Sequence, residues 1–132
     1  MKISAFHLMP HRELPPDFEK RYPSVWVTPP WWELADPVRV GQYYNWTLDE
    51  LLHAARAGFD GVCTNEHHQN AYGFMPSPNI MGAVLAKATN DLPLAIVQMG
   101  ATLPTQNPPI RVAEEYAMLD CISGGRLVAG LP

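Results

Sequence analysis

Short apolar runs alternate with amphipathic stretches along most of the chain, and this alternation limits the folds available to it. The runs at residues 2–8, 59–64, 92–99 and 127–131 have the length and composition of strands. The run at 92–99 is nearly continuous, which is typical of a strand buried on both faces of a parallel sheet. Strands that alternate with helices imply right-handed crossovers. The sequence therefore predicts an α/β fold with about four parallel strands and three helices.

The three predicted helices have recognisable start and stop signals. The first is expected to begin at a capping box over 47–50 and to end at Gly58. The second is expected to begin at the Ser-Pro pair 77–78, and the third follows the two prolines 108–109 and ends at the turn 123–126. Helical spacing predicts that they bury these residues: Leu48, Leu51, Leu52 and Ala55; Ile80, Met81, Val84, Leu85 and Ala88; Ile110, Ala113, Tyr116 and Ala117.

The chain is too short for the complete fold that alternating strands and helices of this kind usually form. A closed (β/α)8 barrel takes about 250 residues. This chain has 132 residues and ends on the fourth predicted strand. We therefore expect the N-terminal half of a TIM (β/α)8 barrel, with residues 1–132 as the N-terminal part of a single domain.

A long segment after the first predicted strand, residues 9–46, shows neither a helical nor a strand period. Half of the fourteen prolines fall between Pro10 and Pro37, where they remove backbone donors and fix turns. All four tryptophans, Trp26, Trp31, Trp32 and Trp46, lie in the same segment, which makes it too apolar for a solvated linker. The sequence predicts a packed loop on the active-site side. It leaves open whether the loop is a lid that binds ligand or only a cover for the barrel end.

Ionisable side chains gather directly after the second predicted strand, at Glu66, His67 and His68. In parallel α/β folds the loops beyond the carboxyl ends of strands carry the functional site, and imidazoles are the groups that titrate near neutral pH. The pattern therefore favours an enzyme-like site. A satisfied polar cluster is the structural alternative. A metal site is disfavoured because neighbouring residues on a strand point to opposite faces.

Other residues near this predicted edge have weaker patterns. Small residues at 100–102 follow the third strand and would let a flat ligand approach the backbone closely. His7 ends the first strand, where lining the site and simple packing are both open, and His11 is expected to contact substrate from the loop. Asp120 and Arg126 flank the last turn and are expected to form a structural ion pair.

Charge and cysteine content indicate the class of partner and the compartment. The formal net charge is −4, without a basic stripe for nucleic acid or a polybasic patch for a membrane surface. Small molecules or proteins are the expected partners. Cys63 and Cys121 are isolated and lie in apolar surroundings, which favours buried thiols in a reducing cytoplasm.

Several motifs in matching order resemble the luciferase-like flavin-dependent monooxygenases, the family of bacterial luciferase. They are Gly-Phe-Asp-Gly-Val-Cys-Thr-Asn-Glu-His-His at 58–68, Leu-Pro-Thr-Gln-Asn-Pro-Pro-Ile-Arg at 103–111, Ala-Glu-Glu at 113–115, Leu-Asp at 119–120 and Ser-Gly-Gly-Arg at 123–126. The resemblance covers residues 47–131 closely and 2–8 loosely.

The resemblance implies a (β/α)8 barrel that takes reduced FMN from a separate flavin reductase and uses O2 to oxygenate a small organic substrate. His67 matches the family histidine that manages a proton in the closed site, and Glu66 and His68 match positions that orient it or line the site. The segment that would lie against the flavin ring, often through a bulge or a non-proline cis peptide, is Met99, Gly100, Ala101 and Thr102.

The same resemblance leaves alternatives and gaps. A deazaflavin-dependent oxidoreductase with the same barrel is one alternative, and a non-catalytic flavin-binding or assembly half-barrel is another. A zinc hydrolase is a third. A homodimer is expected. The family's phosphate ligands come largely from later βα units, so the 132-residue chain alone is expected to be inactive.

Overall fold

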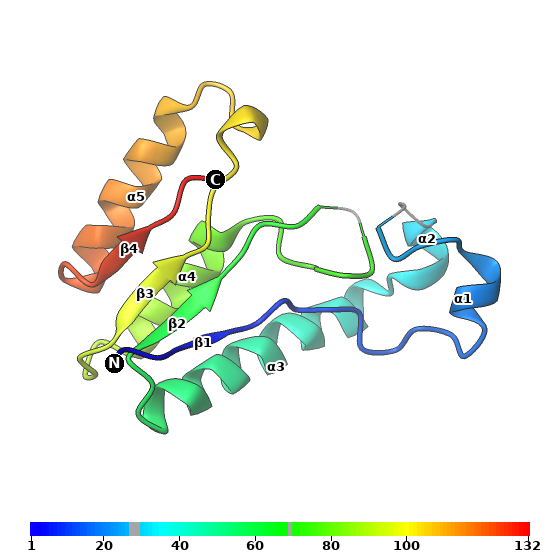
Figure 1. The fold of residues 1–132 in the computed structure, drawn as a ribbon, viewed down its shortest axis with the longest axis horizontal. Helices are drawn as coiled ribbons and strands as arrows, with labels where there is room; N and C mark the ends of the chain where they lie inside the picture. Colours follow the sequence, from blue (N-terminus) through cyan, green and yellow to red (C-terminus); the bar gives the residue numbers. More distant parts are fainter. Residues whose placement is uncertain (27–29, 69) are drawn as a thin grey trace.

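The computed structural model describes residues 1–26, 30–68 and 70–132 and shows an α/β fold (Figure 1). Its sheet contains four parallel strands that are adjacent in chain order. The predicted α/β class with four parallel strands is confirmed, although each strand is shorter than the apolar run that predicted it. The strands are β1 (Ser4–Phe6), β2 (Gly61–Thr64), β3 (Ala95–Gln98) and β4 (Leu127–Ala129).

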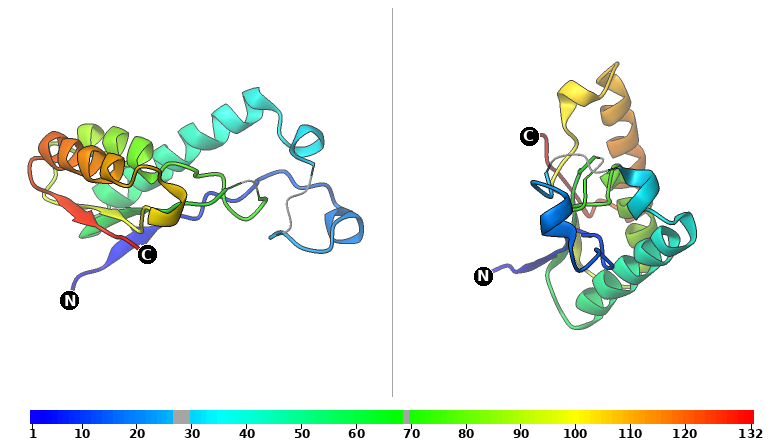
Figure 2. Two further views of the ribbon diagram at one scale, coloured as in Figure 1. Left: turned by 90° about the horizontal axis from the view of Figure 1, so that it is seen from above. Right: turned by 90° about the vertical axis from the view of Figure 1, so that its right-hand side faces the viewer.

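Three long helices connect the strands and lie together on one face of the sheet (Figure 2). They are α3 (Pro37–Arg56), α4 (Pro78–Ala88) and α5 (Ile110–Ser123). Short helical turns interrupt the connections: α1 (Phe18–Arg21), α2 (Trp31–Leu34) and the 3-10 helix η1 (Leu103–Thr105). The second and third helices begin close to their predicted starts. Ser77 is the N-cap of α4 with Pro78 at its first position, and Pro109 is the N-cap of α5.

The strand register divides the sheet into a covered and an open face. Val62 pairs with Ile96, and Ile96 pairs with Leu127, so these side chains point the same way and meet the helices in one apolar cluster. The alternate positions point to the other face, where Phe6 and Val128 are 49% and 50% exposed. The open face is the one that would lie inside a closed barrel.

The helix α3 begins earlier than the sequence predicted. Its N-cap is Asp36, whose carboxylate accepts hydrogen bonds from the backbone N–H groups of Val38 (2.8 Å) and Arg39 (3.0 Å). Thr47 lies inside the helix and is fully buried, and its hydroxyl has no hydrogen-bond partner among the described residues. The capping box over 47–50 is therefore wrong as a start signal. The Asp-Pro pair is the true start, because Asp caps and Pro fits the first helical position.

The prediction of an irregular segment over 9–46 is wrong from residue 37 onward, where α3 begins, and at the short helices α1 and α2. The expected packing against the rest of the protein is present. Arg12 pairs with Glu50 of α3 at 2.5 Å, and Glu13 accepts hydrogen bonds from Arg39 and from the Tyr43 hydroxyl. Trp26, Trp31 and Trp32 remain exposed. Part of the predicted loop, residues 27–29, lies outside the described residues.

The buried faces of α4 and α5 match the predicted ones only in part: Met81, Leu85 and Tyr116 are buried as predicted. Gly82, Leu85 and Ala86 face the sheet, and Val112 is buried on α5. Gly82 is needed there because a Cβ atom would lie 2.1 Å from the buried amide of Gln98. The predicted core positions on the outer side are exposed, as is Met118: Ile80, Val84, Ile110, Ala113, Ala117. Both helices carry apolar residues on two sides, so helical spacing alone does not identify the face that meets the sheet.

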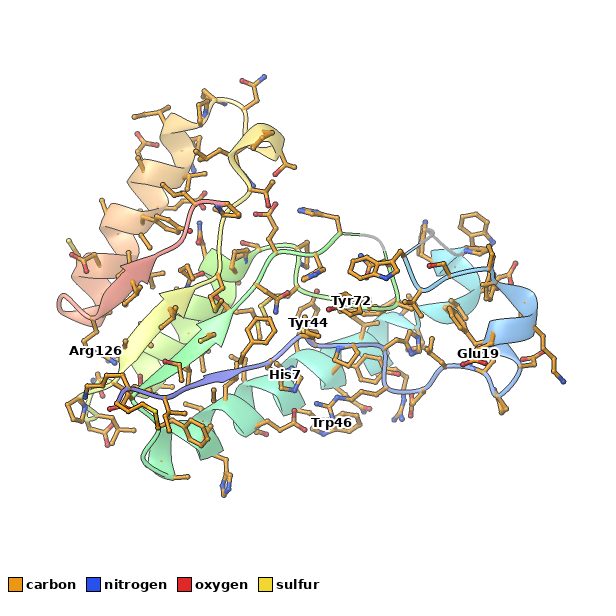
Figure 3. All side chains as sticks on the ribbon, viewed as in Figure 1. His7, Glu19, Tyr44, Trp46, Tyr72 and Arg126 are labelled. Carbon is orange, nitrogen blue, oxygen red and sulfur yellow. The ribbon has the colours of Figure 1, made fainter. Side chains whose placement is uncertain are left out.

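Arg126 is not paired with Asp120, as the sequence predicted. Its guanidinium donates to the backbone carbonyls of Ala86 (2.8 Å), Leu94 (3.2 Å) and Ser123 (2.7 Å). It therefore satisfies carbonyls at the ends of α4 and α5. Figure 3 shows Arg126 at the opposite end of the sheet from Tyr44 and Tyr72.

The two cysteines differ in exposure. Cys63 is buried on β2, whereas Cys121 is exposed on α5, so the prediction of a buried thiol is wrong for Cys121. Within residues 1–26, 30–68 and 70–132, no helix is long and apolar enough to cross a bilayer.

Two substitutions test whether Asp36 or Thr47 caps the start of α3. Asp36→Ala should lower the free energy of unfolding by about 1 kcal/mol, because it removes the acceptor for two end-of-helix N–H groups. Thr47→Val should leave that free energy unchanged or raise it, since it removes a buried hydroxyl without a partner. Urea unfolding followed by circular dichroism measures both. A loss at Thr47 as large as that at Asp36 would contradict this assignment.

Candidate functional site

The loops that follow β2 and β3 meet at the carboxyl edge of the sheet. The backbone N–H of Met99 donates to the carbonyl of Thr64 (2.8 Å), and the N–H of Thr102 donates to the carboxylate of Glu66 (2.8 Å). The structure therefore brings together the two groups of residues singled out in the sequence, 66–68 and 99–102. Parallel strands make this possible because their carboxyl ends share one edge.

The imidazole of His67 is held from several sides. Its Nδ1 lies 2.5 Å from Oδ1 of Asn65, and its backbone N–H donates to the carbonyl of Met75 (2.9 Å). Gly73 packs directly on the ring, since a Cβ atom there would lie 2.7 Å from the His67 Cβ. The ring of Tyr72 meets it edge-on at 5.1 Å between centroids. These contacts fix the ring in one orientation.

Two effects keep His67 neutral near pH 7. Partial burial lowers the pKa of the His67 imidazole, and the neighbouring His68 lowers it further through charge repulsion. A neutral imidazole has one nitrogen that donates and one that accepts. His67 can therefore accept a proton or a hydrogen bond at the nitrogen that does not face Asn65.

Glu66, unlike His67, has its side chain fully engaged in hydrogen bonds within the protein. Its side chain is 1% exposed, and its carboxylate accepts from Nε2 of His68 (2.7 Å), the N–H of Thr102 (2.8 Å) and the hydroxyl of Thr105 (2.9 Å). Burial alone would raise the pKa of this carboxyl, but the hydrogen bonds outweigh burial and hold its pKa below the ordinary value. Glu66 therefore fastens the turn over 102–105 to the end of β2.

The segment after β3 forms a flat, tightly held piece of backbone. The Met99–Gly100 peptide bond is cis, the geometry that the family resemblance implied for a flavin-facing segment. Gly100 lies against β4, since a Cβ atom there would be 2.2 Å from the carbonyl oxygen of Gly130. The N–H of Ala101 donates to Gly130 and to the Tyr116 hydroxyl, both at 3.1 Å. Ala101 is 2% exposed and Met99 is 55% exposed, so Met99 is open to a ligand and the methyl of Ala101 is not.

An aromatic pocket of about 310 Å³ opens beside His67 and His68. Its walls come from the segment after the first strand, from α3 and from the loop that follows the histidines. Sequence reasoning anticipated His11 as a lining residue but missed Tyr44 and Phe74, whose positions no local motif indicates. The main lining side chains are His11, Trp31, Tyr44, His67, His68 and Phe74.

His7 does not join this pocket with its ring. Its Nε2 lies 2.7 Å from the carboxylate of Glu50, and its Nδ1 accepts from the N–H of Met9 (2.8 Å). Its backbone carbonyl does take part, because it accepts from the amide of Asn65 (2.6 Å). For metal binding, no group of three His, Cys, Asp or Glu side chains within residues 1–26, 30–68 and 70–132 is arranged to hold an ion.

The role assigned to Glu66 predicts a pH-dependent contribution to stability. Because folding lowers the pKa of Glu66, its contribution is complete above the unfolded value, near 4.5, and is lost as pH falls through the lower folded value. Glu66→Gln should destabilise the protein at pH 7, since an amide cannot accept from three donors. The difference from wild type should shrink below about pH 4. Urea unfolding across this range measures it, with exposed Glu114→Gln as the control; a constant difference would contradict the prediction.

Comparison with known proteins gives partial matches to oxygenases. The chain is 33% identical over 90 residues to the oxygenase component of the flavin-dependent trigonelline monooxygenase of Acinetobacter baylyi, covering 68% of this chain and 24% of that protein. It is 36% identical over 74 residues to the alkanal monooxygenase alpha chain of Photorhabdus luminescens, covering 56% of this chain and 20% of that protein. The chain thus spans about a fifth to a quarter of the length of these relatives.

Solved structures and a family model agree with these matches. The oxygenating constituent of 3,6-diketocamphane monooxygenase from Pseudomonas putida, a type II Baeyer–Villiger monooxygenase solved with FMN, superposes with a TM-score of 0.70 at 20% identity. The match covers 100% of this chain and 29% of that one, so the four strands form a fragment of such a (β/α)8 barrel. The family model described as luciferase-like monooxygenase matches residues 31–131. The chain therefore belongs to the luciferase-like monooxygenase family.

Proposed function

We propose that this chain is the first part of a monooxygenase that uses reduced FMN and O2 to oxygenate a small organic substrate. One observation carries the proposal: an oriented, neutral His67 lies at the same sheet edge as the exposed residue Met99. A proton-handling group beside a flat platform is the arrangement that flavin-dependent oxygenation requires.

The residues at this edge fit a flavin ring through packing. The N–H groups of Met99, Ala101 and Thr102 already donate to the protein, so they are not free to bind the ring. The exposed side chain of Met99 would pack against it instead. When bound, reduced FMN supplies the electrons with which O2 is activated.

The chain's own residues then have distinct parts in the reaction. His67 would hold or move a proton at its Nε2. Glu66 would keep the turn over 102–105 in place through its three hydrogen bonds, and His68 would line the site beside it. The aromatic walls of the pocket would exclude water from the reacting groups.

A separate flavin reductase is the partner that this chemistry requires. The trigonelline enzyme of Acinetobacter baylyi is described as an oxygenase component, and the diketocamphane enzyme as an oxygenating constituent with FMN. By analogy, we expect reduced FMN to reach this protein from a reductase in the cytoplasm.

Replacing His67 tests this function in the full-length protein. His67→Ala should bind reduced FMN under anaerobic conditions with little change in affinity, because the flavin is held elsewhere. On mixing with O2 it should release hydrogen peroxide in place of oxygenated product, with coupling reduced by a factor of about 100 or more. A peroxidase-linked assay together with product analysis measures how the consumed O2 divides between hydrogen peroxide and oxygenated product.

The control is His53→Ala, which removes an exposed imidazole from α3. Normal coupling in His67→Ala would remove that residue from the mechanism. Failure of the wild-type protein to bind reduced FMN would contradict the proposed cofactor, and binding of a deazaflavin coenzyme instead would establish the alternative.

We further propose that the protein is a homodimer that uses the outer face of α4 and α5. The apolar side chains on this face are exposed: Ile80 by 68%, Met118 by 64%, Ile122 by 47% and Val84 by 44%. Ile80, Met118 and Ile122 border a groove between the two helices, which also contains Asn79 with a buried carbonyl oxygen that lacks a partner among the described residues. A contiguous apolar face of this kind is typical of subunit interfaces.

Introducing negative charge on this apolar face tests the dimer. The double variant Ile80→Glu with Met118→Glu should shift the full-length protein from dimer to monomer, because it would bring four carboxylates into an apolar interface. Light scattering coupled to gel filtration measures the mass. Val38→Glu, at a site that is 72% exposed on α3, is the control. A monomeric wild-type protein would contradict the proposal.

A further inference from the structure

The aromatic pocket beside His67 has walls fixed by hydrogen bonds. The N–H of His11 donates to the carbonyl of Ala71 (3.0 Å), and the N–H of Phe74 donates to the carbonyl of Met9 (2.8 Å). The Tyr44 hydroxyl of α3 donates to the carbonyl of Phe74 (2.8 Å). Three separate segments of the chain are thereby joined around the pocket, so its shape exists before any ligand binds.

Two polar side chains in the pocket walls, those of His11 and Asn70, already form hydrogen bonds with the protein. Nδ1 of His11 accepts from the N–H of Glu13 (3.1 Å), so its Nε2 carries the proton and donates to the carbonyl of Leu34 (2.9 Å). Asn70 accepts at its oxygen from the N–H groups of Tyr72 and Gly73, and its amide donates to the carbonyl of His68. His11 has no donor left for a ligand, and Asn70 keeps only the second N–H of its amide.

Charge is absent from the described lining of the pocket. The lining contains no Asp, Glu, Lys or Arg side chain, and most of it is aromatic or aliphatic. His68 is half exposed, and its Nε2 faces the carboxylate of Glu66 at 2.7 Å. A charged ligand would lose its hydration in this pocket, and the one lining group that could oppose an anion, His68, is already paired with Glu66.

Asn65 decides which hydrogen-bonding group His67 offers to the pocket. The amide atom of Asn65 that lies 2.6 Å from the carbonyl oxygen of His7 must be its nitrogen, since a carbonyl only accepts. The other amide atom, its oxygen, therefore faces Nδ1 of His67 at 2.5 Å, and Nδ1 must carry the proton. Nε2 is then the unprotonated nitrogen and acts as an acceptor. Asn65 is 1% exposed, so water does not compete for these bonds.

From these contacts we infer that the pocket takes an uncharged, ring-sized organic molecule with one hydrogen-bond donor, a hydroxyl or an N–H group, directed at Nε2 of His67. The Tyr44 hydroxyl, whose proton is already donated, offers only a second acceptor. A compound whose polar group only accepts, such as a simple aldehyde or ketone, cannot form a hydrogen bond with Nε2 of His67. This inference assigns a substrate class to the site of the proposed function, but the binding itself requires no flavin.

Nitrogen NMR on the flavin-free, full-length protein labelled with ¹⁵N-histidine tests the inference directly. His67 should show the tautomer protonated at Nδ1. Three probes of similar size separate the chemical classes: phenol, benzaldehyde and benzoate. Phenol should shift the Nε2 resonance and bind roughly 3-fold to 10-fold more tightly than benzaldehyde, the ratio expected for one neutral hydrogen bond. Benzoate should not bind measurably.

Asn65→Leu isolates the positioning role of this amide. The variant should populate the Nε2-protonated tautomer and lose the preference for phenol over benzaldehyde. Asn79→Leu, the same change in the groove between α4 and α5, should alter neither. Should Asn65→Leu fail to fold, the wild-type tautomer and the three-probe comparison still decide the matter.

The outcomes also separate this inference from the proposed function. A wild-type His67 protonated at Nε2, or benzoate binding as tightly as phenol, would overturn the inference even if the protein oxygenates some substrate with FMN. Absence of FMN binding would overturn the proposed function and leave the phenol measurement unaffected.

Discussion

The buried carboxylate of Glu66 holds together the edge on which the site depends. It accepts three hydrogen bonds from groups on two loops, and so connects the end of β2 to the turn that follows β3. A carboxylate that is 1% exposed is stable only when its charge is satisfied by such donors. This contact connects the turn that follows Met99 and Gly100 to the residue before His67.

A second group of contacts orients His67 without touching Glu66. The amide of Asn65 connects the carbonyl of His7 to the imidazole, while Gly73 leaves room for the ring to pack against backbone. The three residues Glu66, His67 and His68 are adjacent in sequence but act in two separate hydrogen-bond networks. One network shapes the platform after β3, and the other sets the protonation of the nitrogen that faces the pocket.

The segment between β1 and α3 is held against α3 and supplies part of the pocket lining. Ion pairs and hydrogen bonds of Arg12 and Glu13 fasten it to α3, and Trp31 lines the same pocket as His67 and His68. The side chain of Trp26 stacks on Tyr72, which in turn meets the His67 ring. The segment therefore forms part of the pocket wall.

The sequence by itself determined the α/β class, the parallel strands, the starts of α4 and α5, and the placing of Glu66, His67 and His68 after a strand, because these follow from periodicity and local capping chemistry. Tertiary structure decided the start of α3, where Asp36 and Thr47 both satisfy the local rules, and the buried face of α4, which depends on the contact of Gly82 with Gln98. It also decided the partners of Arg126 and the role of Asn65. Those choices depend on groups distant in sequence, and a one-dimensional pattern holds no information about which of them become neighbours.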